Sequence, residues 1–272
     1  KERDIFLTTI HTLASGSSGN SLLLRCGETN LLLDAGISCR RITAALRDLG
    51  LSITDLSAVL ITHTHSDHIS GMQTLLRRTD FPVYASAQTC RELSYRLAGI
   101  DHRLQSCAYG EGAPLGSCTV TLFPTSHDSP GSSGYRIDTE DGAVGVLTDT
   151  GYVTAEARQT LSGAELLVLE ANHDVDTLRS GPYPYYLKQR ILGSAGHLSN
   201  EDAAVFAVEM ACQGTREIVL AHLSQENNTP VMAQNAVERA LSAAGAEAAL
   251  SVAPRDRSSR PYLLTGGVPC RR

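Results

Sequence analysis

Three histidines and an aspartate stand within six consecutive positions of the sequence, in the segment THTHSDHISG. They are His63, His65, Asp67 and His68, and they directly follow the apolar run AVLIT at residues 58–62. Imidazole and carboxylate groups are ligands that suit Zn²⁺ and, less tightly, Mn²⁺ or Fe²⁺. A solvated turn with incidental histidines is the alternative interpretation, but the arrangement His-x-His-x-Asp-His is specific and favours a metal site.

The position of this motif predicts two metal sites rather than one. The apolar run is predicted to form a buried strand and residues 67–78 a helix, so the motif occupies the turn between them. His63 and His65 are two positions apart at the strand end and therefore point to the same side. Asp67 and His68 open the helix and point in another direction. We therefore expect one site rich in histidine beside one of mixed imidazole and carboxylate ligands.

Strand-like and helix-like runs alternate along the whole chain and are bounded by Gly, Asn, Asp and Pro. The predicted strands are residues 5–13, 21–26, 30–34, 58–62, 82–85, 118–123, 134–138, 143–148, 165–170, 217–221 and 247–252. The predicted helices are residues 38–48, 67–78, 88–97, 154–162, 184–192, 200–213 and 230–244. The first strands are separated by short turns, as in β-hairpins, and the later strands are separated by helices. This order predicts a layered α/β fold with two mixed sheets in the middle. Because no linker or repeat divides the chain, residues 1–272 are predicted to form a single domain.

The composition limits the class of protein. Of the 272 residues, 42% are hydrophobic and 19% charged, as in an ordinary globular protein, and the net charge of −6 argues against binding nucleic acid through overall positive charge. The seven cysteines are scattered without a Cys-x-x-Cys pair, which favours reduced thiols. No apolar run approaches the ~18 residues that span a membrane, and the first residues lack the apolar core of a signal peptide. A cytoplasmic location without membrane association is expected.

The histidine motif resembles the signature of the metallo-β-lactamase fold, a four-layered αββα sandwich with its metals at one edge. All five motifs of that family occur here in order, each after an apolar strand; the other four are Asp34 in LLLDAG, His127 in FPTSHD, Asp149 in VLTDTG and His222 in VLAHLS. The resemblance implies that two divalent metal ions, Zn²⁺ or Mn²⁺ with Fe²⁺ as a further candidate, bind here. It assigns His63, His65 and His127 to one ion, Asp67, His68 and His222 to the other, Asp149 to both, and a supporting role to Asp34.

Residue identities within this set favour one branch of the fold. Oxygen-reducing relatives typically carry glutamate at the position of His65, so the histidine favours hydrolysis. A bridging aspartate such as Asp149, rather than a cysteine, is usual in the phosphodiesterase branch. Two metal ions lower the pKa of a shared water to about 7 and stabilise the charge on a phosphodiester. A bridging hydroxide is therefore the expected nucleophile, and Asp67 is expected to orient it.

Three further stretches bear on the substrate, and each has a structural alternative. In ASGSSGNS (residues 14–21), Ser17, Ser18 and Asn20 are candidates for an anion-binding nest, with a flexible hairpin turn as the alternative. The stretch LEANHDVDTLRSGPYPYYLKQR (169–190) offers Arg179 and Lys188 among tyrosines for phosphate contact and base stacking, with an amphipathic helix as the alternative. In GSAGHLSN (193–200), Ser199 precedes a helix N-terminus that suits a phosphate group, or simply caps that helix.

Together these stretches resemble the YycJ/WalJ subgroup, small bacterial exonucleases of the metallo-β-lactamase fold. The resemblance covers most of residues 12–230 and implies a 5′-to-3′ exonuclease acting on double-stranded DNA, with a role in DNA repair and without the β-CASP insertion of larger nucleases. The leaving oxygen needs a proton. His197 is the first candidate for the donor and His173 the second, because both lie in the segment expected to border the cleft.

Two other functions compete with this hypothesis. A small-molecule phosphodiesterase or thioester hydrolase would use the same metal site. An open groove with the basic residues 40, 41, 179, 188 and 190 near the metals would favour nucleic acid, whereas a closed pocket would favour a small ester. A non-catalytic metal-binding regulatory module is the alternative from another class. The complete ligand set counts against it.

Overall fold

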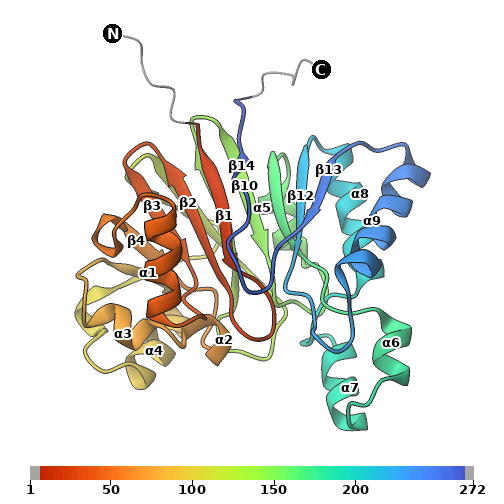
Figure 1. Ribbon diagram of the computed structural model, residues 1–272, viewed down its shortest axis with the longest axis horizontal. Helices are drawn as coiled ribbons and strands as arrows, with labels where there is room; N and C mark the ends of the chain where they lie inside the picture. The colour runs from red at the N-terminus through yellow and green to blue at the C-terminus, as the bar shows by residue number, and fades with distance from the viewer. Residues whose placement is uncertain (1–6, 267–272) are drawn as a thin grey trace.

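The computed structural model describes residues 7–266, and two seven-stranded sheets form its centre (Figure 1). The first sheet has the order β14-β1-β2-β3-β4-β5-β6 and the second the order β13-β12-β11-β10-β9-β8-β7. The strands of the first sheet are β1 (Thr9–Ala14), β2 (Ser21–Cys26), β3 (Thr29–Leu33), β4 (Ala58–Leu60), β5 (Val83–Ser86), β6 (Leu104–Cys107) and β14 (Tyr262–Leu263). Those of the second are β7 (Gly112–Leu115), β8 (Cys118–Pro124), β9 (Ser133–Thr139), β10 (Gly142–Leu147), β11 (Leu166–Glu170), β12 (Glu217–Ala221) and β13 (Ala249–Val252).

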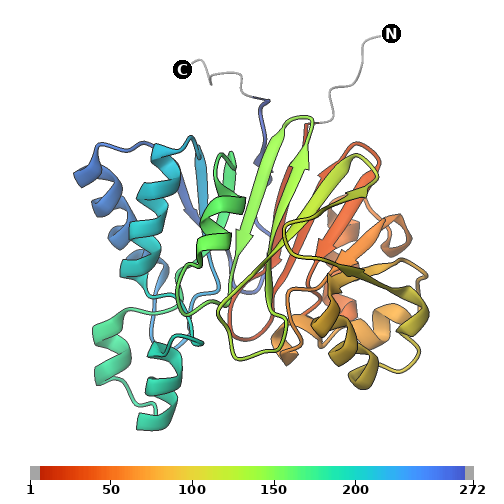
Figure 2. The same ribbon diagram turned by 180° about the vertical axis from the view of Figure 1, so that it is seen from behind.

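Helices flank both sheets, and most of them cover the outer faces (Figures 1 and 2). They are α1 (Cys39–Asp48), α2 (Ser66–Ile69), α3 (Met72–Leu76), α4 (Ala87–Arg96), α5 (Ala155–Leu161), α6 (Val175–Ser180), α7 (Tyr185–Leu192), α8 (Asn200–Cys212) and α9 (Pro230–Ala244), with 3₁₀ turns at Ile53–Asp55 and Asp101–Arg103. Helices α2, α6 and α7 lie at the lower edge in Figure 1. None of the helices within residues 7–266 is long and apolar enough to cross a bilayer.

Three apolar clusters hold the layers together. One joins α1, α3 and α4 to the first sheet, a second fills the space between the sheets, and a third joins the second sheet to α5, α8 and α9. Leu32 and Leu31, neighbours on β3, belong to the first and second clusters respectively, as the alternation of side chains along a strand requires. The predicted αββα sandwich is therefore confirmed.

Strand direction brings several loops to one edge of the molecule. Strands β3, β4 and β5 run parallel, as do β10, β11 and β12. Strand β8 is antiparallel to β9, which is antiparallel to β10, so β8 and β10 point the same way. The segments that follow β3, β4, β8, β10 and β12 contain Asp34 and the predicted metal ligands. They meet at the lower edge in Figure 1, near α2.

Local sequence signals fix many element ends. Thr229 accepts a hydrogen bond from the Met232 N–H at the start of α9, Pro230 takes the first helical position, and Gly245 closes the helix in the left-handed conformation with φ 62°. All predicted strands have counterparts, with β1 starting at Thr9, and so do all predicted helices except the one over residues 67–78. Residues 5 and 6 of the predicted first strand lie outside the described range. Strands β6, β7 and β14 and helix α6 are absent from the prediction.

The single helix predicted over residues 67–78 is wrong. The structure has two short helices, α2 and α3, separated at Ser70 and Gly71. The Gly71 N–H donates to the carbonyl of Ala35 at 2.8 Å, and a Cβ at this glycine would lie 2.2 Å from the carbonyl oxygen of Ile37. The chain bends there because it packs directly against the segment that follows β3.

Cysteine exposure leads to a labelling prediction. The six described cysteines are free thiols; Cys212 is exposed, whereas Cys90 and Cys118 are buried. Burial raises the pKa of Cys90 to about 11 and also raises that of Cys118. Because the thiolate is the nucleophile, we expect iodoacetamide at about pH 8 to label Cys212 first among these six. Peptide mapping before and after denaturation measures this, and early labelling of Cys90 would contradict it.

Candidate metal centre

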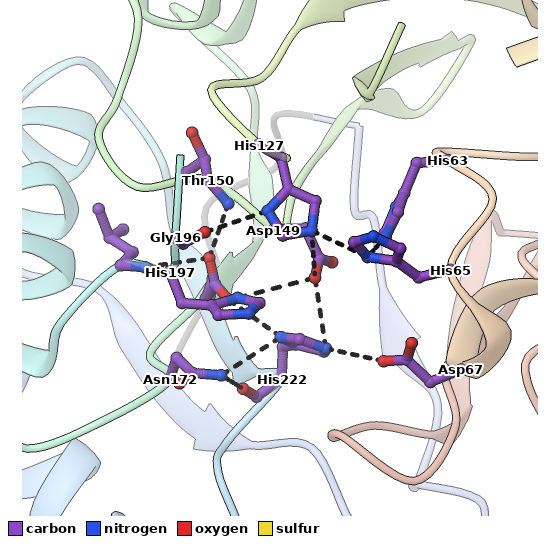
Figure 3. A network of polar contacts seen from close by, with 12 residues as sticks. His63, His65, Asp67, His127, Asp149, Thr150, Asn172, Gly196, His197 and His222 are labelled. Carbon is purple, nitrogen blue, oxygen red and sulfur yellow. Dashed lines mark hydrogen bonds and ion pairs between the residues drawn. The ribbon is translucent and has the colours of Figure 1, made fainter. Parts of the chain in front are cut away.

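Three imidazoles converge on one point at this edge. His63 and His65 follow β4, and His127 follows β8 in the other sheet. His65 Nδ1 lies 3.0 Å from His63 Nε2 and 3.2 Å from His127 Nε2 (Figure 3). Three nitrogen atoms this close, on rings that point toward one another, form a group that can hold a metal ion.

A second group lies beside the first. Asp67 and His68 belong to α2, and His222 follows β12. Asp67 Oδ2 lies 3.6 Å from His68 Nε2 and 3.5 Å from His222 Nε2. This set combines imidazole and carboxylate, so its composition matches the second predicted site.

Asp149 lies between the two groups. Its Oδ2 is 3.4 Å from His68 Nε2, and its Oδ1 is 3.5 Å from His222 Nε2 and 3.8 Å from His127 Nε2. Asp149 Oδ2 and His222 Nε2 are buried and have no hydrogen-bond partner among the described residues. Buried polar atoms are rarely left unpaired, and a divalent cation would satisfy both. The donor set therefore fits a pair of metal ions.

The ring nitrogens that face away from these groups are held by neighbours. His68 Nδ1 donates to Asp34 Oδ2 at 2.7 Å, and His63 Nδ1 donates to Thr62 Oγ1 at 3.0 Å. Asp34 also accepts the Thr62 N–H at 2.9 Å and the Thr62 hydroxyl at 2.8 Å. These bonds fix both rings with Nε2 directed into the two ligand groups. Asp34 thus has the geometry expected of a supporting residue.

Glu170, the last residue of β11, was not predicted from the sequence as a site residue. Its buried carboxylate accepts hydrogen bonds from His222 Nδ1 at 2.9 Å and His197 Nδ1 at 2.8 Å. The backbone N–H groups of Thr150 and Leu198 donate to its second oxygen at 3.0 and 3.2 Å. A signal was present, because Glu170 is an ionisable residue at the end of an apolar strand, just as Asp34 and His222 directly follow one.

Asp128 was also missed, although it directly follows His127. Its Oδ1 lies 3.5 Å from His65 Nε2, and its Oδ2 accepts a 2.6 Å hydrogen bond from Arg190 Nε. His127 Nδ1 donates to the Gly196 carbonyl at 3.1 Å. The histidine-rich group is therefore held from the side of α7, by Arg190 through Asp128 and by Gly196 directly.

Three site residues have a strained backbone. Asp34, Asp149 and His222 adopt positive φ angles of 59°, 57° and 56°, a conformation that costs a residue other than glycine on the order of 1–3 kcal/mol. Asp34 and His222 stand immediately after a strand end, and Asp149 two positions after one. The chain turns sharply at all three positions, and there Asp34 bonds His68 while Asp149 and His222 contact each other.

The electrostatics of the site favour bound positive charge. Burial lowers the pKa of His63 well below its usual value, and the neighbouring imidazoles lower it further, so this ring is neutral as a ligand must be. Burial would lower the pKa of His68 as well, but the carboxylates of Asp149 and Asp34 raise it to about 9. For Asp67, His222 and His68 outweigh burial and lower the pKa. The carboxylates therefore create a negative field that a divalent cation can neutralise.

The predicted substrate residues have unequal surroundings. Ser17 and Ser18 are exposed in the turn between β1 and β2. Asn20 is buried, with Nδ2 3.1 Å from His68 Nε2 and Oδ1 accepting the Gly16 N–H. Arg179 is exposed on α6. The Lys188 ammonium donates to the carbonyls of Arg179 and Gly181 at 2.7 Å each, and the Ser199 hydroxyl caps α8 by accepting the Asp202 N–H at 3.1 Å. The geometry thus brings Ser17 and Asn20 to the metal centre and gives Lys188 and Ser199 structural contacts.

The two candidate proton donors differ in position. His197 lines a cavity of about 180 Å³ beside the metal groups, and its Nδ1 is held by Glu170. Burial would lower its pKa, but the charge of Glu170 and this hydrogen bond raise it. His173 is buried, is outside the lining of that cavity, and is held through its carbonyl by the Asn200 N–H at 2.8 Å. The arrangement favours His197.

A substitution at Asp34 tests the support of the metal centre. Asp34→Asn keeps the shape of the side chain but removes the charge that fixes His68 Nδ1. We expect metal affinity at the Asp67, His68 and His222 group to fall by about 10–100-fold, measured by competition with a chromogenic chelator. The exposed Asp176→Asn serves as control; equal affinities for the two variants would contradict the support role.

Residues 29–223 match the family described as a β-lactamase superfamily domain. The exodeoxyribonuclease YycJ of Bacillus anthracis is 38% identical over 234 residues, which cover 86% of this chain and 89% of that protein. The exodeoxyribonuclease WalJ of Streptococcus pneumoniae serotype 2 (strain D39) is 42% identical over 224 residues, 81% and 83% of the two chains. The metallo-β-lactamase fold protein YhfI from Bacillus subtilis shares the fold, with a TM-score of 0.68 at 18% identity over 92% of this chain and 99% of that one.

Proposed function

The chain belongs to the β-lactamase superfamily and, within it, to the family of the YycJ and WalJ exodeoxyribonucleases, and from this premise we propose that it is a metal-dependent 5′-to-3′ exonuclease of double-stranded DNA with a role in DNA repair. The observation that carries the proposal is the convergence of two complete ligand groups on Asp149. A non-catalytic metal-binding module would not require a carboxylate placed between two such groups.

We assign the ligands as two sets that share one residue. His63, His65 and His127 hold the first divalent ion, and Asp67, His68 and His222 hold the second. Asp149 contacts both, since its two oxygens face both groups. Bound ions would lower the pKa of a water molecule between them and stabilise charge on the phosphodiester oxygens. Zn²⁺ or Mn²⁺ suits this donor set.

The protein's own residues supply orientation and proton transfer. Asp67, at 22% side-chain exposure, is the most accessible carboxylate of the ligand set and can accept a hydrogen bond from the attacking water. His197 is the proposed donor to the leaving oxygen, because Glu170 holds its Nδ1 and leaves Nε2 for the cavity. Glu170 also bonds His222, so one buried carboxylate positions a metal ligand and the acid together.

The surroundings of the centre support a polymeric, anionic substrate. The exposed hydroxyls of Ser17 and Ser18 lie in the β1–β2 turn, and Ser17 lines the same cavity as Arg190 of α7. Arg40 and Arg41 begin α1, where Arg41 donates to the Asp256 carbonyl at 3.0 Å. Basic side chains at these places can contact phosphates although the net charge of the chain is −6.

A small-molecule phosphodiesterase is the second candidate, and one observation favours it. The cavity beside the metal groups is about 180 Å³ in volume, which suits a compact group better than a whole duplex. The same site would then hydrolyse a small phosphodiester.

Substrate comparison distinguishes these two functions. Purified protein with Mn²⁺ is given a 5′-phosphorylated DNA duplex, single-stranded DNA, RNA and bis-p-nitrophenyl phosphate. We expect the duplex to be shortened fastest, with a 5′ label released before a 3′ label, and Asp67→Ala to be inactive. Hydrolysis of bis-p-nitrophenyl phosphate without release of nucleotides from any polymer would defeat the nuclease proposal and support the small-molecule one.

A further inference from the structure

One wall of the cavity beside the metal centre is apolar and comes from α7. Leu187 and Ile191, one turn apart on this helix, both line the cavity, as does Tyr183 just before it. None of the residues of α7 is fully buried, so Leu187 and Ile191 do not fill a core and their apolar surface faces the cavity. By contrast, Tyr185 and Tyr186 are 77% and 74% exposed.

The opposite wall belongs to the metal centre itself. His127, a proposed metal ligand, and His197, the proposed proton donor, both line the cavity. The cavity therefore lies on the side from which the leaving oxygen would receive its proton. Polar groups of Asn172 and Ser224 complete the lining, so the site pairs an apolar wall with a few polar contacts, as ligand pockets do.

The α7 wall is fixed in place before any ligand binds. The Lys188 ammonium ties α7 to the end of α6 through the carbonyls of Arg179 and Gly181. At the other end of the helix, the Ser126 hydroxyl donates to the Ser194 carbonyl at 2.6 Å and His197 N–H to the Ile191 carbonyl at 3.0 Å. A wall fixed in this way lowers the entropy cost of binding.

Arg190 is the one arginine or lysine among the described residues that line this cavity. Arg190 donates through Nε to Asp128 Oδ2, and its side chain is 57% exposed. Its two terminal nitrogens have no hydrogen-bond partner within residues 7–266. They remain available to an anionic group, and a guanidinium suits a phosphate.

We propose that the cavity between α7 and the metal centre holds the terminal nucleotide of the strand being cut, so that each hydrolytic step releases one nucleotide. The nucleoside packs against Tyr183, Leu187 and Ile191, and Arg190 faces its 5′-phosphate. At about 180 Å³ the cavity is far too small for a duplex, so only the end of a single strand can enter it. This inference rests on the proposed exonuclease function and adds the substrate unit and its subsite.

Placing the terminal nucleotide in this cavity agrees with the bonds that break and form during hydrolysis. Water attacks the phosphorus between the first two nucleotides, and the bond from that phosphorus to the 3′-oxygen of the first nucleotide breaks. The water oxygen and one hydrogen remain with the phosphate on the shortened strand. His197 gives a proton to the departing 3′-oxygen and recovers one from the water by way of solvent. The released nucleotide carries its own 5′-phosphate and a new 3′-hydroxyl, and it lies in the cavity that His197 lines.

Filling the cavity tests the proposal. Leu187→Trp places a large ring in it, and Tyr186→Trp places the same ring at the neighbouring exposed position as a matched control. Calorimetry on the Mn²⁺-loaded protein measures the affinities for thymidine 5′-monophosphate and for inorganic phosphate. We expect wild type and Tyr186→Trp to prefer the nucleotide by at least tenfold, on the scale of base–aromatic stacking, and Leu187→Trp to lose that preference. Ile191→Trp replaces Leu187→Trp if circular dichroism shows that the latter does not fold.

Product analysis completes the experiment. A 5′-labelled duplex should yield the label as mononucleotide with wild type, and Leu187→Trp should cut at least tenfold more slowly with two metal equivalents still bound. Equal nucleotide preference in wild type and both cavity variants, or release of longer products by wild type, would overturn the subsite. If wild type cuts no polymer but its nucleotide preference is lost in Leu187→Trp, the nuclease proposal fails while the nucleotide site stands.

Discussion

Replacing Asp67 with alanine should lower kcat on duplex DNA by about 10³-fold or more, because a catalytic metal ion contributes several kcal/mol and each 1.36 kcal/mol is a factor of ten. Asp67 Oδ2 lies within 3.6 Å of His68 Nε2 and 3.5 Å of His222 Nε2, so its loss leaves the second group with two imidazoles and a share of Asp149. We expect the bound metal, measured by mass spectrometry of the purified protein, to fall from two equivalents toward one.

The control is Asp48→Ala, which removes a 74% exposed carboxylate at the end of α1 and should leave both metal content and kcat unchanged. Circular dichroism separates loss of metal from loss of fold. If Asp67→Ala keeps two equivalents and a kcat within tenfold of wild type, Asp67 is neither a ligand nor a guide for the attacking water.

The architecture could be predicted from sequence because the strands inside the two sheets are short apolar runs with clear boundaries. The strands that escaped prediction, β6, β7 and β14, all lie at sheet edges. Strand β7 has the sequence GAPL, whose glycine and proline argue against a strand, and β14 has only two residues. The sequences of edge strands show little alternation of apolar and polar residues. Their pairing depends on the adjacent strand more than on their own sequence.

The spacing in residues 63–68 predicts metal ligands by itself, whereas His127, Asp149 and His222 were assigned through the resemblance to the motifs of the metallo-β-lactamase fold. Glu170 ends an apolar strand, but its role and that of Asp128 could not be predicted, since each role depends on which distant groups the carboxylate meets. Glu170 joins His197 and His222, 27 and 52 residues away in the chain. Asp128 joins Arg190 to His65. The sequence shows that both residues are acidic, but not which groups they contact. The position of α7 gives Asp128 its partner Arg190, and the pairing of β11 with β12 brings Glu170 to His222.

Replacing His197 with alanine should lower kcat on duplex DNA by about 10²–10⁴-fold, the range that a positioned acid contributes, while two metal equivalents are retained. The His197 ring lines the cavity, and its Nδ1 bonds Glu170. Because His197 is outside the proposed ligand set, its loss removes the proton donor and leaves the metal ligands in place. The loss on bis-p-nitrophenyl phosphate should be at least tenfold smaller, since p-nitrophenolate leaves as a stable anion and needs little help from an acid.

The same assays on His173→Ala identify the donor. His173 is buried and does not line the cavity, so its replacement should affect both substrates equally, through stability alone. If the loss specific to DNA appeared in His173→Ala instead of His197→Ala, the acid would be His173 and the segment around α8 would have to open during turnover. If neither variant distinguished the two substrates, the leaving oxygen would take its proton from solvent, and Glu170 would serve only to hold His222.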